Sequence, residues 1–536
     1  MLPGTQVLRM AVPAYCQDDP ALPRVIDEAE ADLLLSGLAG RTVGQCLPEP
    51  PRELPVVDPD ATVLEIAAVM ARTRSPLVAV VDEGGWVDAR PGYVGRAAGP
   101  DVGVMSATAW LAVAVFTVAY ILIATERVHR VAAALGGAAI MLVVGATDAE
   151  HAFFSEQAGI DWNVIFLLLG MMLIVAVLQR TGVFEYLAIG AAKRAKGRPF
   201  RVMVILVLVT AVASALLDNV TTVLLVAPVT FVVCQRLGVP VVPFLIAEAM
   251  ASNIGGTATL VGDPPNIIIA SRAGLSYNDF LVHLAPLVVV LLVVFLGLCR
   301  WLFRSGFGYD ADRAAGVAAL RERDAIRDVR LLVVSLVVLA VVTAAFVLHT
   351  VLHLQPSVVA IVGGLLLLAV SRLDAADVAK DVEWPTLAFF AGLFVMVGGL
   401  VATGVIDTIA RAAAQATEGR LLLASMVLLW ASAVLSAIVD NIPYAATMSP
   451  IVSELVASNS GHSAKEVLWW SLALGADLGG NATAVGASAN VVVLGIAERN
   501  GARISFWQFS KYGLIVTVIT VAISAGYLWL RYFALA

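Results

Sequence analysis

Between residues 106 and 530 the chain carries one apolar run after another, most of them about as long as a bilayer-spanning helix. One soluble core cannot bury so many runs, so these segments are predicted to lie in a membrane. The composition agrees, because 60% of the 536 residues are hydrophobic and 14% are charged, whereas soluble domains are about 25% charged. The net charge of −7 disfavours a nucleic-acid partner, since phosphate backbones attract basic surfaces. The sequence predicts an all-α, multi-pass protein of the plasma (inner) membrane that is not an enzyme and needs no cofactor.

Composition divides the chain into four parts. Residues 1–104 lack an apolar run of this length and are predicted to form a small soluble α/β domain. Residues 105–303 and 331–536 hold the apolar runs, and the charged segment 304–330 is predicted to be a cytoplasmic linker.

The N-terminal part contains one informative stretch. Asp60 precedes residues 62–67, which predict the start of a helix, and the apolar residues 77–81 predict a buried strand. This pattern resembles a single CBS repeat, a module usually found in the cytosol, and the resemblance implies a nucleotide as a partner of this domain. A generic helix–strand fragment is the alternative.

The two apolar parts repeat each other. Residues 214–220 (SALLDNV) match residues 436–442 (SAIVDNI) at an offset of 222 positions. The Gly-rich segment 255–266 matches 479–490 at an offset of 224 positions, with both Gly-Gly pairs and a final Asn retained. Internal repeats of this kind are typical of secondary transporters.

The repeats are predicted to be inverted. Each repeat contains five full crossings plus one broken pair, which we interpret as a re-entrant helical hairpin. Because the number of crossings is odd, the second repeat has the opposite orientation in the membrane. Outside the N-terminal part, 21 Lys and Arg residues fall on one predicted face and 5 on the other, which makes the first face cytoplasmic. The N-terminus then falls outside, whereas a CBS-like domain is expected inside, and the sequence leaves this conflict open.

Polar residues break four of the apolar runs, at 218–222, 253–266, 440–444 and 477–490. Irregular backbone at membrane depth is tolerated only inside protein or along a wet cavity. We therefore expect the four breaks to meet near the middle of the membrane.

The hairpin breaks supply a carboxylate, amides and hydroxyls at the N-terminus of a helix, where anions and ligand groups bind readily. A capping role for Asp218 is the alternative, but a buried carboxylate in a membrane costs at least ~2.5–3.5 kcal/mol, and its duplication favours function. The predicted ligand residues are Asp218, Asn219, Thr221, Thr222, Asp440 and Asn441, with sodium placed near Asp218, Asn219, Asp440 and Asn441.

The Gly-rich breaks expose carbonyl, amide and hydroxyl oxygens that suit a hard cation or an oxyanion, and a structural kink is the alternative. The predicted ligand residues are Asn253, Gly255, Gly256, Thr257, Thr259, Asp263, Asn266, Asp477, Asn481, Thr483 and Asn490. The two breaks are not equivalent, because the second copy lacks Asp263 and has Asp477 where the first has Asn253.

Other polar residues are weaker candidates. Glu248 could relay protons or form a structural pair, while Asp161 and Glu383 precede matched Trp residues and are expected at membrane interfaces. Cys234 and Cys299 are expected to be small buried filler. The histidines His151, His349 and His353 are expected to be solvated.

These motifs resemble the ion transporter superfamily, and most of all its arsenite-permease and P-protein branch, which shares the citrate-transporter-like domain. The resemblance is carried by residues 218–229 (DNVTTVLLVAPV), residues 251–271 (ASNIGGTATLVGDPPNIIIAS) and their echoes in the second repeat. It implies a scaffold domain, a mobile transport domain that holds both hairpins, elevator-type alternating access and often a homodimer.

We therefore predict a proton- or sodium-coupled transporter of a small inorganic ion or organic anion. Carboxylates at both hairpin tips would repel a dicarboxylate unless they were protonated or cation-bound, which favours efflux of arsenite, a neutral hydroxide at pH 7. A sodium/proton antiporter and a dicarboxylate/sodium symporter are alternatives. An anion channel or a sensor regulated by the CBS-like domain would be a different class.

Overall fold

The computed structural model describes residues 56–57, 79–80, 106–125, 127–155, 158–304, 307–308, 322–417, 420–458 and 462–535. The chain separates into two units between residues 103 and 104. In the first unit, β1 (Val56–Val57) and β2 (Ala79–Val80) pair in parallel. The helix expected after Asp60, the rest of the CBS-like stretch and most of the linker 304–330 lie outside the described residues.

The second unit is helical wherever the structure describes regular elements. Its first half contains α5 (Ala107–Ala124), α6 (Arg130–Val143), α7 (Ala149–Phe154), α8 (Trp162–Gln179), α9 (Val183–Arg194), α10 (Pro199–Leu216), α11 (Asn219–Leu237), α12 (Val242–Gly256), α13 (Pro264–Ala273), α14 (Tyr277–His283) and α15 (Ala285–Leu302). A short 3-10 helix, η4 (Glu322–Ala325), precedes the second half.

The second half contains α17 (Val329–Leu352), α18 (Pro356–Ser371), α19 (Ala375–Asp381), α20 (Trp384–Ala402), α21 (Val405–Ala416), α22 (Leu421–Ile438), α23 (Asn441–Ser458), α24 (His462–Gly479), α25 (Ser488–Arg499) and α26 (Phe506–Trp529), followed by a π-helical turn, η5 (Leu530–Ala534). Helices α5, α8, α10, α11, α15, α17, α20, α22 and α26 are long and apolar enough to cross a membrane. The predicted all-α multi-pass fold is therefore confirmed.

The two arms of the first predicted hairpin, α10 and α11, are both long helices. Helix α10 has 18 residues and α11 has 19, so each is about 27 Å long at 1.5 Å per residue. Pro199 starts α10 at a position where its missing N–H costs nothing. Helix α11 continues through polar residues until Gly238, which adopts a left-handed conformation and ends it.

The packing of the helices is repeated between the two halves. The pair α10 and α12 has its counterpart in α22 and α24, and α8 with α18 has its counterpart in α20 with α6. Contacts between the halves are also paired, since α13 packs on α23 as α25 packs on α11. The order of packing follows the sequence repeat, while inversion of the second copy stays a prediction.

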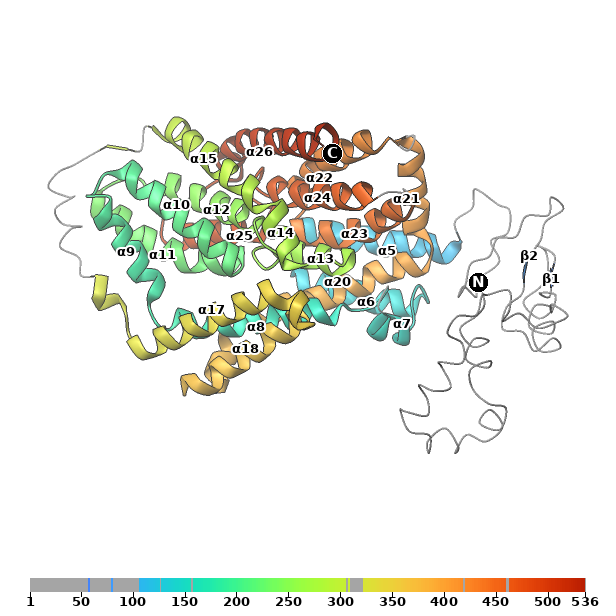
Figure 1. Cartoon of the computed structure of the whole chain (residues 1–536), viewed down its shortest axis with the longest axis horizontal. Coiled ribbons are helices and arrows are strands. Elements are labelled where there is room, and N and C mark those ends of the chain that lie inside the picture. The colour runs from blue at the N-terminus through green and yellow to red at the C-terminus, as the bar shows by residue number, and fades with distance from the viewer. Residues whose placement is uncertain are drawn as a thin grey trace, which may run out of the picture. The chain divides into compact units, whose positions relative to one another are not determined.

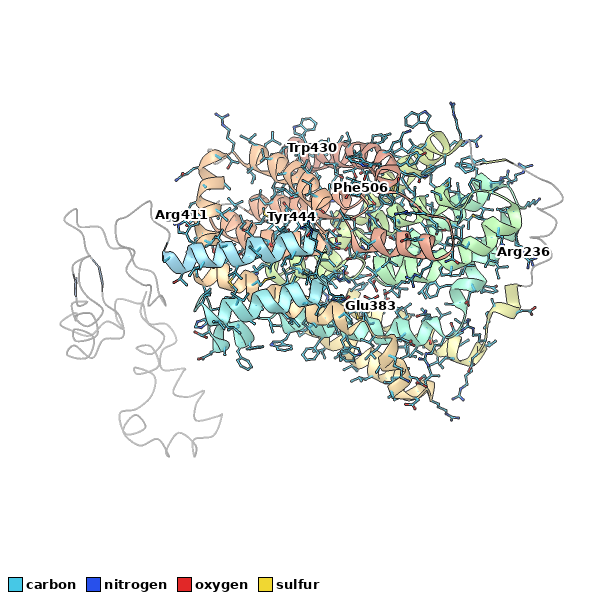
Figure 2. All side chains as sticks on the ribbon, turned by 180° about the vertical axis from the view of Figure 1, so that it is seen from behind. Arg236, Glu383, Arg411, Trp430, Tyr444 and Phe506 are labelled. Atoms are coloured by element: carbon cyan, nitrogen blue, oxygen red, sulfur yellow. The ribbon has the colours of Figure 1, made fainter. Side chains whose placement is uncertain are left out.

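We call α10–α13 and α22–α25 the hairpin unit, and α5, α6, α8, α17, α18 and α20 the frame helices. Figure 1 shows α8, α17 and α18 along one side of the helical unit, α15 and α26 along the opposite side, and the hairpin unit between them. Arg236 and Arg411, which the charge count assigns to different membrane faces, lie toward opposite ends of the bundle in Figure 2.

Glycine allows the hairpin unit to pack closely. A Cβ atom on Gly255 would lie 2.3 Å from the Ala211 carbonyl oxygen of α10, and one on Gly479 would lie 2.6 Å from the Ala433 carbonyl oxygen of α22. Both distances are far below contact, so only glycine lets the backbones approach. A glycine at the same position of each repeat therefore allows the hairpin arms α10 and α22 to pack closely on the broken helices α12 and α24.

Candidate functional site

The four polar breaks meet inside the hairpin unit. The first tip (residues 217–219) joins α10 to α11, and the second tip (residues 439–441) joins α22 to α23. Asn219 at the first tip and Asn441 at the second both donate hydrogen bonds to Asp263, which lies in the break between α12 and α13. Side chains from both repeats therefore share one buried centre.

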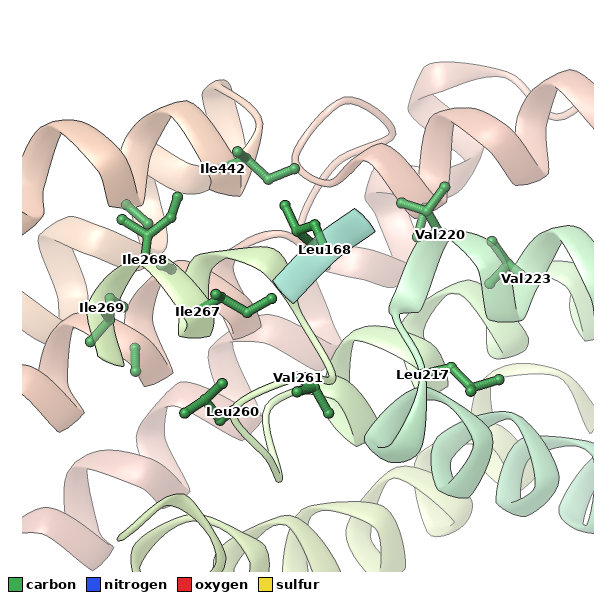
Figure 3. Close-up of a cluster of buried hydrophobic side chains, with 14 of the residues drawn as sticks. Leu168, Leu217, Val220, Val223, Leu260, Val261, Ile267, Ile268, Ile269 and Ile442 are labelled. Carbon is green, nitrogen blue, oxygen red and sulfur yellow. The ribbon is translucent and has the colours of Figure 1, made fainter. Parts of the chain in front are cut away.

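The segments that form this centre also carry buried apolar side chains. Figure 3 shows Leu217 and Val220 at the first tip, Val261 in the break before α13, Ile267 on α13 and Ile442 at the start of α23. The five side chains are buried. Polar groups in such surroundings must pair with one another, because water cannot satisfy them.

Asp263 is the most strongly bonded carboxylate of the centre and is fully buried. Its Oδ2 atom accepts from Asn219 Nδ2 at 2.8 Å, and its two oxygens each accept from Asn441 Nδ2 at 3.2 Å. Asn219 and Asn441 are equivalent in the repeat. Asp263 itself has no counterpart, because Ala487 occupies the equivalent position. A single carboxylate therefore accepts from both tips.

A second link crosses the repeats at Asn253. Its Nδ2 atom donates to Asn481 Oδ1 at 3.0 Å and to Asn490 Oδ1 at 3.2 Å, while its Oδ1 accepts from Asn219 at 3.1 Å. Asp477, the counterpart of Asn253, is also fully buried, but neither carboxylate oxygen has a hydrogen-bond partner among the described residues.

Several predicted ligand residues hold the broken backbone in place. Thr259 Oγ1 donates to the Ala215 carbonyl at 2.6 Å, and Thr483 Oγ1 donates to the Ala437 carbonyl at 2.5 Å. These bonds tie each break to the hairpin arm beside it. In the structure both Thr hydroxyls donate to backbone carbonyls, and their role as ligand residues stays a prediction.

The Asn side chains at the ends of the two breaks also stabilise the broken backbone. Asn266 Nδ2 donates to the Gly256 and Thr259 carbonyls, and Asn490 Nδ2 donates to those of Gly480 and Thr483. Each amide bonds carbonyls on the far side of its own break, so it holds the loop closed.

The Asp residues at the tips cap the helices that follow. Asp218 accepts from the Thr221 N–H at 2.8 Å and Asp440 accepts from the Ile442 N–H at 3.0 Å. Asp440 also accepts a short hydrogen bond from the Ser488 hydroxyl, which α25 supplies. Thr222 is buried and its hydroxyl has no partner among the described residues, whereas Thr221 is half-buried.

A cavity of about 390 Å³ reaches the second tip. It is lined by Ile123, Ala124, Val128, His129, Arg130, Phe389, Ile438, Asp440, Val485, Ser488, Val491 and Val492. Of these, the frame contributes Arg130 and Phe389, and the hairpin unit contributes Asp440 and Ser488. This is the described site where an ion or a small molecule can touch a tip carboxylate.

Arg130 was not among the residues that the sequence singled out. Its Nη1 donates to Ser488 Oγ at 2.9 Å, and its Nη2 donates to Thr386 Oγ1 at 3.3 Å, while the guanidinium lies over the Phe389 ring. Thr386 in turn donates to Glu383 at 3.0 Å. The sequence signal was weak, because an Arg in a short loop before an apolar run counts first as a charge that sets orientation.

The weaker candidates lie apart from this centre. Glu248 is buried on α12, where one oxygen accepts from Thr230 at 2.5 Å and the other has no partner among the described residues. Asp161 caps α8 and accepts from Ser271. Cys234 and Cys299 are buried free thiols.

The three histidines divide by exposure. His151 and His353 are exposed, while His349 is half-buried and bonds the Phe346 carbonyl. Within the described residues no group of three or more His, Cys, Asp or Glu side chains could hold a metal ion. A hard monovalent cation would depend on amide and carbonyl oxygens instead.

Comparison with known proteins gives a family match and a set of relatives. Residues 120–475 match the family model described as citrate transporter. An uncharacterized transporter of Mycobacterium tuberculosis is 58% identical over 423 residues, which cover 79% of this chain and 99% of the relative. The human P protein is 32% identical over 496 residues, and the match spans 78% of this chain but 59% of that protein.

One solved structure has a similar fold. The crystal structure of the YdaH transporter of Alcanivorax borkumensis aligns with a TM-score of 0.51 at 15% sequence identity and covers 79% of this chain and 98% of its own. At this identity the likeness concerns the fold alone.

Proposed function

This chain belongs to the citrate transporter family of the ion transporter superfamily, and from that membership we propose a cation-coupled secondary transporter of a small oxyanion or its neutral hydroxide, with arsenite efflux as the leading case. The observation that carries the proposal is the buried carboxylate centre. Asp218, Asp263, Asp440 and Asp477 interact electrostatically within the hairpin unit. A centre so rich in carboxylates attracts cations.

The same centre argues for a cargo of low charge. Like charges at close range in a poorly screened site cost several kcal/mol, so a dianion would need protonation or bound cations to approach Asp440. A neutral hydroxide meets no such barrier and can bond both the Asp440 carboxylate and the Ser488 hydroxyl, which line the cavity.

Transport of an organic anion of the citrate type is a second candidate, and Arg130 favours it. Two of its N–H groups bond hydroxyls, while the side chain borders the cavity beside the N-terminal end of α25. A guanidinium at that place can pair with a carboxylate. Sodium/proton antiport remains a third candidate because it needs only the carboxylate centre.

We further propose that the hairpin unit moves against the frame helices. Its two halves pack on each other through α11 with α25 and α13 with α23, which supports their moving as one body. Arg130 and Ser488 form one of the side-chain links between the frame and this unit. Such a link must break when the unit slides.

The cavities support a state open on one side. The cavity of about 390 Å³ lies beside the loop that joins α5 to α6, which the charge count places at the cytoplasmic face. A cavity lined by Asp161, Arg272 and Ser449, placed toward the other face by the same count, holds about 10 Å³. The proposed state faces the cytoplasm.

Flux measurements in proteoliposomes test the proposal. Radiolabelled arsenite, citrate and succinate are offered in parallel under imposed proton and sodium gradients, and empty liposomes give the background. We expect gradient-driven arsenite movement that Asp440→Asn abolishes, with Glu454→Gln, an exposed residue of α23, as the matched control. Citrate transport without arsenite transport would select the second candidate, and gradient-independent flux would indicate a channel and contradict the proposal.

A further inference from the structure

Asp477 is a buried acid that nothing in its surroundings satisfies. It lies near the end of α24, its side chain is fully buried, and both carboxylate oxygens have no hydrogen-bond partner among the described residues. Leaving a buried ionised carboxylate unpaired is among the most costly arrangements in a protein. The structure therefore requires a positive charge or a proton at this place.

The polar neighbours of Asp477 direct their hydrogens to backbone carbonyls. Asp477 faces Thr257 and Asn266 of the first repeat. The Thr257 hydroxyl donates to the Asn253 carbonyl at 2.9 Å, and the Asn266 amide donates to the Gly256 and Thr259 carbonyls at 3.3 and 3.1 Å. Neither group makes a hydrogen bond to Asp477 in the structure.

The orientation of Asn266 is fixed by those bonds, because a flipped amide would turn its oxygen toward two carbonyls. Its Oδ1 atom is consequently left buried without a partner among the described residues. Asp477 and Asn266 thus both have buried acceptor atoms without a partner among the described residues.

The equivalent position in the first repeat shows which group can make these hydrogen bonds. An offset of 224 relates Asp477 to Asn253, Thr257 to Asn481 and Asn266 to Asn490. There, the Asn253 amide donates to both Asn481 Oδ1 and Asn490 Oδ1. The second copy replaces that amide by a carboxyl group of the same shape, so a hydrogen carried by Asp477 would restore the bond.

We propose that Asp477 binds the proton that couples to transport, and that the protonated carboxyl donates toward Asn266 or Thr257 as the Asn253 amide does in the other repeat. The step adds one proton to the carboxylate and forms one O–H bond. A proton fits among these fully buried side chains without new room, whereas a sodium ion would need space of its own. The inference rests on the proposed function, since release of the proton requires movement of the hairpin unit.

The groups around Asp477 are consistent with this role. Asp263 interacts electrostatically with Asp477, as it does with Asp218 and Asp440, and is already bonded by the two tip amides. Among the other helices packed on α24, α12 carries Glu248, which bonds Thr230, and α13 carries Arg272, which faces Asp161. Glu454 of α23 and Lys511 of α26 are exposed, and α22 has no charged residue. Among these groups none pairs with Asp477.

Two measurements on the purified full-length protein test the proposal without using a cargo. Infrared difference spectra between acidic and alkaline buffer should contain the carbonyl stretch of buried protonated carboxyls, and Asp477→Asn should lose the component that Asp477 contributes. Thermal unfolding of the wild type should shift to lower temperature as pH rises, because deprotonation leaves the unpaired anion. Asp477→Asn should weaken this pH dependence, because only the contribution of Glu248 and the other buried acids is left, and should melt about 2 °C or more higher in alkaline buffer.

The matched control exchanges the two positions. Asn253→Asp combined with Asp477→Asn moves the acid to the repeat-related place, and the infrared band and the pH dependence should return. An unchanged band and an unchanged pH dependence in Asp477→Asn would overturn the proposal. So would stabilisation of the wild type by sodium that Asp477→Asn abolishes, because the occupant would then be sodium. Absence of flux for every cargo would contradict the proposed function and leave these two readouts to decide Asp477.

Discussion

The two hairpin tips carry the same Asp-Asn pair but have different surroundings. Asp218 at the first tip is buried and caps α11. Asp440 at the second tip is half-buried, accepts from Ser488 and borders the cavity. At the position equivalent to Ser488 the first repeat has Pro264, which has neither a hydroxyl nor an N–H to offer. One residue in each break therefore decides which tip is linked to the frame.

The Asn residues of the tips behave in the opposite way. Asn219 and Asn441 keep equivalent roles, because both donate to the carboxylate of Asp263. Asp263 has no partner in the repeat, since Ala487 occupies the corresponding place. The two repeats thus supply two equivalent donors, and only the first supplies the acceptor that serves both.

Removing the shared acceptor should have the largest effect. Asp263→Ala leaves two buried amides without their acceptor, and each lost partner costs about 1–3 kcal/mol, so we expect a loss of roughly 3 kcal/mol in stability. The measurement is thermal unfolding in detergent, with Asp374→Asn, an exposed helix cap of α19, as the control. A melting temperature equal to that of the wild type would show that the two tips do not depend on Asp263.

A single substitution can remove the contact that distinguishes the second tip from the first, and its effect should be smaller than that of Asp263→Ala. Ser488→Ala deletes the hydroxyl that joins Arg130 to Asp440 and should weaken cargo binding about tenfold, as expected for a loss near 1.4 kcal/mol. Pro264→Ala, at the equivalent position, breaks no side-chain hydrogen bond and should leave affinity within about twofold. Concentration dependence of uptake measures both, and equal effects would show that the Ser488 contact does not distinguish the tips.

The paired Thr contacts should have the smallest effects. Thr259→Val and Thr483→Val each remove one hydroxyl bond to a hairpin-arm carbonyl, at about 1 kcal/mol. Thr259→Val also removes the acceptor of the Gly262 N–H, so we expect it to cost about 1 kcal/mol more than Thr483→Val in thermal unfolding. The double variant should show the sum of the two losses, because the contacts share no partner. Equal losses would show that the Gly262 bond contributes nothing to stability.

Much of this arrangement could be predicted from residues alone. The offsets of 222 and 224 predicted two equivalent sets of helices, and the polar breaks predicted where helices end, since α12 ends at Gly256 and α24 at Gly479. The capping role of Asp218, first treated as an alternative to ligand binding, is present in the structure. It does not exclude a second role, because a cap uses only part of a carboxylate.

Other features depended on which side chains meet across the repeats. Arg130 is far from Ser488 in sequence, so no local pattern could connect them. In the sequence, Asp263 and Asp477 are both acids within a polar break, and nothing distinguishes their hydrogen bonding. In the structure, Asp263 accepts from both tips, whereas Asp477 has no hydrogen-bond partner among the described residues.

The sequence by itself determined the helical membrane architecture, the duplication and the positions of the breaks, because those follow from hydropathy, helix-breaking residues and repeated spacing along one chain. Only the tertiary structure decided which acid is bonded, which is left without a partner and which borders a cavity. Hydrogen bonding in a buried centre depends on the placement of individual donors and acceptors from separate segments, and a one-residue change such as Pro264 against Ser488 alters that placement while the pattern of the chain stays the same.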